Sequence, residues 1–197
     1  MRLDFNLLAR LKGLAKCFTA TTKPIHIQYR GNKNDAAVVF VHGFGGDAGK
    51  TWGQFPSLLC SEPRIQKWDV YSIGYPSSLR IDVPNLWSAD PQLKTLAIEL
   101  RTFLSLPPFA GYKVIAIAAH SMGGLVVQRA MLDEHKLAAR ISHVIFFGTP
   151  SGGLAKAGLF GRLKRQFRDM AQGSAFVTDL RNDWKKTFGW ETLPDDQ

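Results

Sequence analysis

One stretch of the chain constrains its fold more than any other. Residues 114–128 read VIAIAAHSMGGLVVQ. An apolar run with strand character ends at His120, and an apolar run with helical spacing follows the next few residues. A strand that becomes a helix within one residue leaves little room for side chains, which suits the small residues Ala119 and Gly123. The pattern therefore predicts a strand, a tight turn at Ser121 and a helix, with Ser121 strained and its hydroxyl exposed.

The residues around Ser121 are close to the G-x-S-x-G pattern of a nucleophile elbow, with Ala119 in place of the first glycine. A serine hydroxyl is a weak nucleophile until a base takes its proton and backbone N–H groups stabilise the oxyanion. In an elbow one such donor is the residue after the nucleophile, here Met122. We expect the second donor to be Phe44, in a glycine-rich loop earlier in the chain.

That loop follows a second apolar strand. Residues 36–41 are continuously apolar, as in a parallel strand covered on both faces, and residues 42–46 read HGFGG. The carboxyl ends of neighbouring parallel strands lie at one edge of a sheet, where open α/β sheets bind ligands. We therefore expect this loop to lie beside Ser121. The expected supporting residues are His42, Gly43 and Gly123.

A phosphate-binding loop is a competing interpretation of the same region. Residues 49–51 read Gly-Lys-Thr, as in a P-loop. The spacing fails, because the leading glycine would have to be residue 44, which is phenylalanine. Gly53 and Pro56 also interrupt the helix that should continue through the lysine. These residues argue against nucleotide hydrolysis.

Strand and helix patterns alternate along the rest of the chain. Strands are expected at residues 25–30, 36–41, 69–73, 114–120 and 144–147, the last of them buried. Between them, Asp90 and Pro91 are expected to open a helix whose apolar face is Leu93, Leu96, Ala97, Leu100 and Leu104. Further helices are expected at residues 54–60, after Ser121 and at residues 179–188. This alternation predicts a three-layer α/β/α sandwich with a mostly parallel sheet.

Composition limits the partners and the compartment. The formal net charge is +9, but no zinc-finger spacing, basic zipper or base-stacking aromatic motif accompanies it, so we expect no nucleic-acid partner. The two cysteines, Cys17 and Cys60, form no disulfide framework, which favours free thiols in a reducing, cytoplasmic compartment. The length of 197 residues suits one main domain, residues 21–197.

Two segments carry basic amphipathic patterns. In residues 1–20 leucines share one helical face and cations largely occupy the other. This segment is either a helix packed on the domain or a helix making peripheral contact with an anionic membrane. Residues 154–190 are expected to form either a substrate lid or plain covering helices. The longest apolar runs are about six residues, far short of the roughly 20 that cross a bilayer.

Three motifs in order carry a resemblance to a known family. VVFVHGFGG, AHSMGGLVV and VIFFGTPSGG, within roughly residues 25–155, resemble the α/β-hydrolase superfamily, in particular its lipase-like serine esterases related to the GPI inositol-deacylase group. The resemblance implies hydrolysis of hydrophobic carboxylic esters through a Ser121 acyl-enzyme, with no cofactor and no metal. One small departure is Ser151, where such proteins often have histidine.

A larger departure concerns the rest of the catalytic machinery. In this family the acid and the histidine follow the nucleophile on later loops, whereas the last histidine here is His143, which the pattern places before a strand. The resemblance therefore implies a fold that stops before those residues. Each of the five histidines is interpreted as structural: His26, His42, His120, His135 and His143. Two hypotheses stay open, a serine hydrolase with another base and a catalytically inactive module that binds or scaffolds. The sequence leaves the oligomeric state open.

Overall fold

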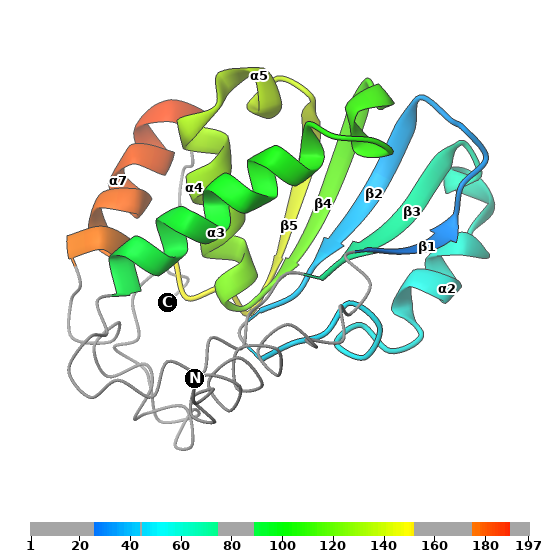
Figure 1. Cartoon of the computed structure of the whole chain (residues 1–197), viewed down its shortest axis with the longest axis horizontal. Helices are drawn as coiled ribbons and strands as arrows, with labels where there is room; N and C mark the ends of the chain where they lie inside the picture. Colours follow the sequence, from blue (N-terminus) through cyan, green and yellow to red (C-terminus); the bar gives the residue numbers. More distant parts are fainter. Residues whose placement is uncertain (1–25, 44, 75–88, 152–174, 190–197) are drawn as a thin grey trace, which may run out of the picture.

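The computed structural model of the chain describes residues 26–43, 45–74, 89–151 and 175–189 (Figure 1). The predicted helix in residues 1–20, the predicted oxyanion donor Phe44 and most of the predicted lid segment lie outside the described residues.

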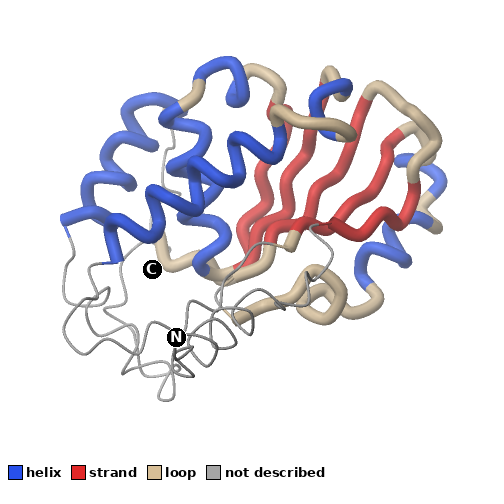
Figure 2. The backbone as a smooth tube through the Cα atoms, viewed as in Figure 1, coloured by secondary structure: helices blue, strands red, loops and turns tan. Residues whose placement is uncertain are grey.

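Within the described residues, five strands form one sheet in the order β1-β3-β2-β4-β5 (Figure 2). Strands β2, β3, β4 and β5 are parallel, whereas β1 pairs antiparallel with β3. The strands are β1 (His26–Arg30), β2 (Ala36–Val41), β3 (Trp68–Ile73), β4 (Val114–His120) and β5 (Ile141–Phe147). The mostly parallel sheet predicted from the sequence is therefore confirmed.

Helices cover both faces of this sheet. The described helices are α2 (Phe55–Cys60), α3 (Ala89–Leu104), α4 (Met122–Asp133), α5 (His135–Ala138) and α7 (Ala175–Phe188), with short 3-10 turns at Pro63–Ile65 and Phe109–Gly111. Helices α3, α4 and α7 lie on one side of the sheet and α2 lies on the other (Figure 1). The predicted three-layer α/β/α sandwich is confirmed, and the helix expected after Ser121 is α4, which ends at Asp133.

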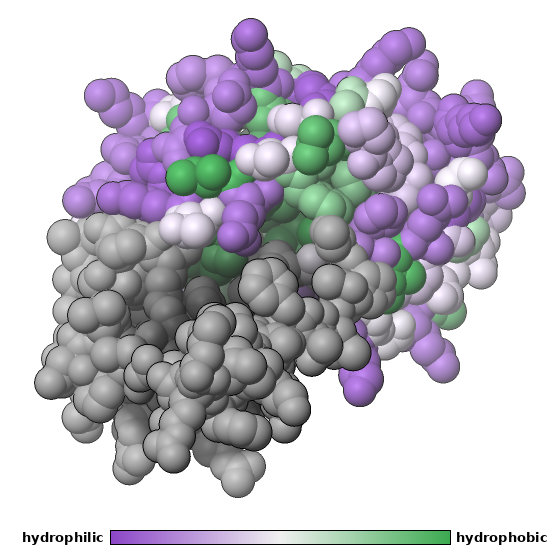
Figure 3. Space-filling view, viewed as in Figure 1, coloured by the Kyte–Doolittle hydropathy of each residue, from purple (hydrophilic) through white to green (hydrophobic). Residues whose placement is uncertain are grey.

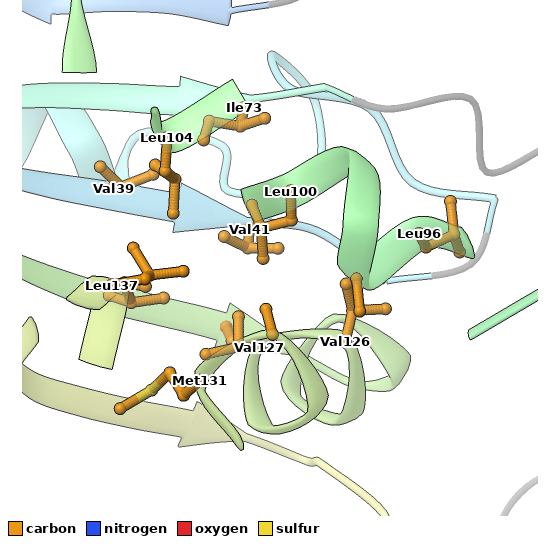
Figure 4. Close-up of a cluster of buried hydrophobic side chains, with 14 of the residues drawn as sticks. Val39, Val41, Ile73, Leu96, Leu100, Leu104, Val126, Val127, Met131 and Leu137 are labelled. Atoms are coloured by element: carbon orange, nitrogen blue, oxygen red, sulfur yellow. The ribbon is translucent and has the colours of Figure 1, made fainter. Parts of the chain in front are cut away.

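Side chains that alternate along the strands build a core on each face. Val39 and Val41 join the larger cluster with α3, α4 and α7, whereas Phe40 joins a smaller cluster with Trp52 on the α2 side. In Figure 4 the leucines of α3 and the apolar residues of α4 point toward one another and toward the strands. All five residues of the predicted α3 face are buried: Leu93, Leu96, Ala97, Leu100 and Leu104. Helix α3 begins at Ala89, one residue before the predicted cap Asp90.

The expectation that strand β5 is buried is wrong. Its residues are intermediate or exposed, and Ile145 is 54% exposed. Strand β4 is its only neighbour among the described strands, and α2 covers the opposite half of the sheet. An apolar sequence alone therefore did not determine burial, because burial also depends on what covers the strand.

The outer surface of the described part is mainly hydrophilic. Hydrophilic residues cover most of the described surface on the side seen in Figure 3, and hydrophobic residues gather in smaller patches near its middle. Among the described helices, none combines the length and the apolar character needed to cross a lipid bilayer. Cys60 has a free thiol, as expected.

A buried carboxylate in β3 forms hydrogen bonds with the loop between β1 and β2 and with the residues just before β4. Asp69, fully buried at the start of β3, accepts hydrogen bonds from the backbone N–H groups of Asn32 and Asn34 at 2.8 and 3.3 Å. The hydroxyl of Tyr112, just before β4, donates to the same carboxylate at 2.8 Å. Since this uses the Tyr112 proton, the Tyr71 hydroxyl must donate to Tyr112 across 2.7 Å. Burial, followed by the hydrogen bonds to Tyr71 and Asp69, raises the pKa of the Tyr112 phenol.

This chain of hydrogen bonds predicts unequal costs for two similar substitutions. Tyr112→Phe removes a donor from a buried carboxylate and should lower the free energy of unfolding by about 2–3 kcal/mol. Tyr71→Phe removes a donor only from a neutral hydroxyl and should cost about 1 kcal/mol. Urea unfolding of both variants measures the difference. A larger loss for Tyr71→Phe would contradict the donor order assigned here.

Candidate functional site

The turn at Ser121 joins the end of β4 directly to the start of α4. Ser121 has φ 52° and ψ −129°. Residues other than glycine rarely adopt a backbone conformation with positive φ. Its N–H donates to the carbonyl of Phe147 at 2.8 Å, and its own carbonyl accepts from the N–H of Gly124 at 3.0 Å. Conformations of this kind cost of the order of 1–3 kcal/mol and persist only where the surroundings enforce them.

The end of strand β2 supplies those surroundings. A Cβ atom on Gly123 would overlap the carbonyl oxygen of His42 and lie 3.0 Å from that of Val41. A Cβ atom on Gly43 would lie 2.9 Å from both the carbonyl oxygen of His120 and Cβ of Ser121. Both glycines are therefore required by close backbone approach, and the structure brings His42, Gly43 and Gly123 together at this turn.

The predicted oxyanion donors have different outcomes. Met122 is the first residue of α4, where backbone N–H groups have no partner inside the helix, and its nitrogen lies 3.4 Å from the position of a Cβ on Gly43. The positive end of the α4 dipole lies at the same place. Phe44 lies outside the described residues. The roles of both residues as oxyanion donors stay predictions.

His42 shapes the loop between β2 and α2. It is buried, and its Nδ1 lies 2.7 Å from the carbonyl oxygen of Gly43. Because a carbonyl oxygen only accepts, Nδ1 must carry a proton in this hydrogen bond. The same carbonyl accepts from the N–H of Gly46 at 3.1 Å and closes the turn. Both contacts lie within the loop beside Ser121, and the structural role of His42 stays a prediction.

The other histidines lie in different surroundings. His120 is exposed, with its ring 6.2 Å from that of Trp52, and His26 contacts the rings of Tyr71, Phe103 and Phe109. His135 begins α5. The expectation that His143 precedes a strand is wrong: it lies within β5, paired with Ala116, because the strand begins at Ile141.

The described part of the chain offers the Ser121 hydroxyl no visible activating partner. Across residues 26–43, 45–74, 89–151 and 175–189, no hydrogen bond joins that hydroxyl to a histidine or a carboxylate. Those residues also contain no cluster of histidine, cysteine, aspartate and glutamate side chains that could hold a metal ion. Among the described residues, we therefore assign no general base to the Ser121 hydroxyl.

Sequence reasoning missed one residue at this site. The side chain of Thr149, in the loop after β5, occupies the space beside Gly124 in the first turn of α4. Its Oγ1 atom is buried without a hydrogen-bond partner among the described residues. The Gly-Thr-Pro sequence after β5 marks this loop in the sequence. A pattern within one segment does not reveal that the loop contacts α4.

The backbone approach at Gly123 makes a testable prediction. Gly123→Ala places a methyl group against a carbonyl oxygen that cannot move without shifting β2, so the free energy of unfolding should fall by about 2 kcal/mol or more. Gly111→Ala is the matched control, because a Cβ at that glycine meets no atom within 4 Å. Its effect should stay within about 0.5 kcal/mol. Equal urea midpoints for the two variants would contradict the close approach.

Comparison with curated proteins finds two similar relatives. Protein SERAC1 of Danio rerio is 30% identical over 157 residues, which cover 66% of this chain and 24% of that protein. Protein SERAC1 of Mus musculus is 31% identical over 143 residues, which cover 60% of this chain and 22% of that protein. The chain thus spans about a quarter of the length of these relatives.

A solved structure with a similar fold is that of phospholipase PlaB from Legionella pneumophila. It is 21% identical, has a TM-score of 0.53, and the match covers 76% of this chain and 34% of that one. This likeness supports the fold alone. The model of the alpha/beta hydrolase family matches residues 38–196, which include the β2 loop, the turn at Ser121 and the loop after β5. The chain therefore belongs to the alpha/beta hydrolase family.

Proposed function

We propose that the chain is a serine hydrolase that cleaves hydrophobic carboxylic esters through an acyl-enzyme on Ser121. The observation that carries the proposal is the strained turn, in which Ser121 joins the end of β4 to the first residue of α4 and lies against Gly43, just after β2. Strained residues of this kind are concentrated at functional sites. Membership of the alpha/beta hydrolase family supports the same class of chemistry.

The proposed reaction has two steps. The Ser121 oxygen attacks the ester carbonyl carbon while its proton passes to a base, and the bond to the alcohol then breaks as the alcohol takes up a proton. Water next attacks the acyl-serine, which releases the carboxylic acid and restores the hydroxyl. In both steps negative charge develops on the carbonyl oxygen, where the N–H groups of Met122 and Phe44 are proposed to donate.

The substrate class also belongs to the proposal. Phospholipase PlaB, with a similar fold, is named for action on phospholipids, and the three sequence motifs resemble those of lipase-like esterases. We therefore place lipid-like esters first among candidate substrates. Peripheral contact of residues 1–20 with an anionic membrane, and a cytoplasmic location, stay predictions because no described residue bears on either.

A second candidate is an α/β-hydrolase-fold module that binds a ligand without turnover. The specific observation in its favour is that no histidine or carboxylate among the described residues is hydrogen-bonded to Ser121. An oxyanion hole without its base and acid retains only a small part of the catalysis of an intact triad. The two candidates therefore differ in one measurable property, the reactivity of the Ser121 hydroxyl.

A fluorophosphonate probe measures that reactivity on the whole chain. We expect the probe to label the wild-type chain and to leave Ser121→Ala unlabelled, because only an activated serine attacks phosphorus at a useful rate. Ser105→Ala is the control, since Ser105 is an exposed serine at the end of α3, and it should be labelled as the wild type is.

The outcomes separate the two candidates. Labelling that depends on Ser121, together with hydrolysis of a short-chain p-nitrophenyl ester, supports the enzyme. A folded wild-type chain that shows neither labelling nor hydrolysis would reject it in favour of the binding module. Equal labelling of the wild type and Ser121→Ala would show that another residue reacts, and would reject Ser121 as the nucleophile.

A further inference from the structure

We propose that Thr149 is a positioning residue for Ser121 and acts through Gly124. Thr149 lies in the loop after β5, and Gly124 lies in the first turn of α4. The inference deepens the proposed function and rests on it, because it concerns how the reactive serine is held. It links two motifs, SMGG and Gly-Thr-Pro, whose contacting residues Gly124 and Thr149 are 25 positions apart in the chain.

The contact between the two residues is close. A Cβ atom on Gly124 would overlap Thr149 Oγ1, and it would lie 2.6 Å from Cγ2 and 2.8 Å from Cβ of the same side chain. All three side-chain heavy atoms of Thr149 therefore lie against the place where any other residue at position 124 would carry its Cβ atom. Glycine at residue 124 and threonine at residue 149 fit each other as one packing unit.

This unit lies on the turn itself. The N–H of Gly124 donates to the carbonyl of Ser121 at 3.0 Å, and the N–H of Ser121 donates to the carbonyl of Phe147 at 2.8 Å. The segment from Phe147 to Thr149 thus holds the turn from both sides, by a hydrogen bond at its start and by packing at its end. A change at Thr149 should move the Ser121 oxygen relative to the N–H of Met122.

The shape of Thr149 is what the contact uses. Its Oγ1 is buried and has no hydrogen-bond partner among the described residues, so the hydroxyl gains no favourable bond there. Valine has nearly the same shape and lacks the hydroxyl. Thr149→Val should therefore preserve the position of the turn, and it should raise the urea midpoint because it removes an unpaired buried polar group.

The backbone around Thr149 is itself fixed. Gly148 has φ 59°, a left-handed conformation that lets the chain leave β5 sharply. The N–H of Ser151 donates to the carbonyl of Thr149 at 2.8 Å and closes a turn just after it. The threonine side chain is therefore presented to α4 from a defined backbone position.

Four variants of the whole chain test the inference: Thr149→Gly, Thr149→Val, Gly124→Ala and the double variant Gly124→Ala/Thr149→Gly. The first readout is fluorophosphonate labelling, with its maximal rate and its half-saturating probe concentration measured separately. The second readout is amide hydrogen exchange at Gly124, whose N–H donates a hydrogen bond to the carbonyl of Ser121. Thr187→Gly, at an exposed residue near the end of α7, is the matched control.

We expect the maximal labelling rate to fall about tenfold or more in Thr149→Gly and in Gly124→Ala, with little change in the half-saturating concentration, because small displacements of reacting atoms have large kinetic effects. Exchange at Gly124 should accelerate in Thr149→Gly. The double variant should recover a substantial part of both properties, since the removed side chain leaves room for the added methyl group. Thr149→Val and Thr187→Gly should be labelled at the wild-type rate.

Other outcomes overturn the inference. If the double variant is no better than Gly124→Ala alone, the two residues do not act as a unit. If Thr149→Val loses labelling as Thr149→Gly does, the hydroxyl and not the shape is responsible. If even the wild type is not labelled, the proposed function fails, and exchange at Gly124 still decides the inference: unchanged exchange in Thr149→Gly would reject it.

Discussion

The close approach of two backbone segments is the constraint on which the rest of the site depends. The carbonyl of His42, at the end of β2, lies where a side chain of Gly123 would be, and Gly43 lies against the Ser121 turn in the same way. No side chain separates the two segments, so the turn cannot relax without displacing the end of a central strand. This contact explains how a non-glycine residue is kept at φ 52°.

The fold brings these segments together through the order of its strands. Strands β2 and β4 are parallel neighbours in register from Ala36 and Val114 to Val41 and Ala119, so their carboxyl ends meet at one edge. Side chains on both faces fix that pair: Val39 and Val41 pack toward α3 and α4, and Phe40 packs against Trp52. The buried Asp69 joins the opposite end of the sheet to the turn at Asn32 and Asn34. Core packing on both faces therefore fixes strands β2 and β4, and close backbone contact fixes the turn at their carboxyl ends.

The sequence predicts those features that are local or periodic. The apolar run of β2 and the buried face of α3 follow from spacing alone, and the small residues around Ser121 indicate a sharp turn. Contacts between distant segments have no such signal, so neither the packing of Thr149 on Gly124 nor the hydrogen bond from Tyr112 to Asp69 can be predicted from the sequence pattern. The exposure of β5 was missed for a related reason, because burial depends on elements elsewhere in the chain.

Whatever its role in catalysis, Ser121 is strained, and its surroundings enforce the strain. Glycine adopts positive φ without penalty but ordinarily destabilises a structured position by about 0.5–1 kcal/mol relative to alanine. The most direct measurement is therefore the difference in the free energy of unfolding between Ser121→Gly and Ser121→Ala. Because glycine relieves the strain, Ser121→Gly should be more stable than Ser121→Ala by about 1 kcal/mol or more. Equal stability, or greater stability of Ser121→Ala, would contradict it.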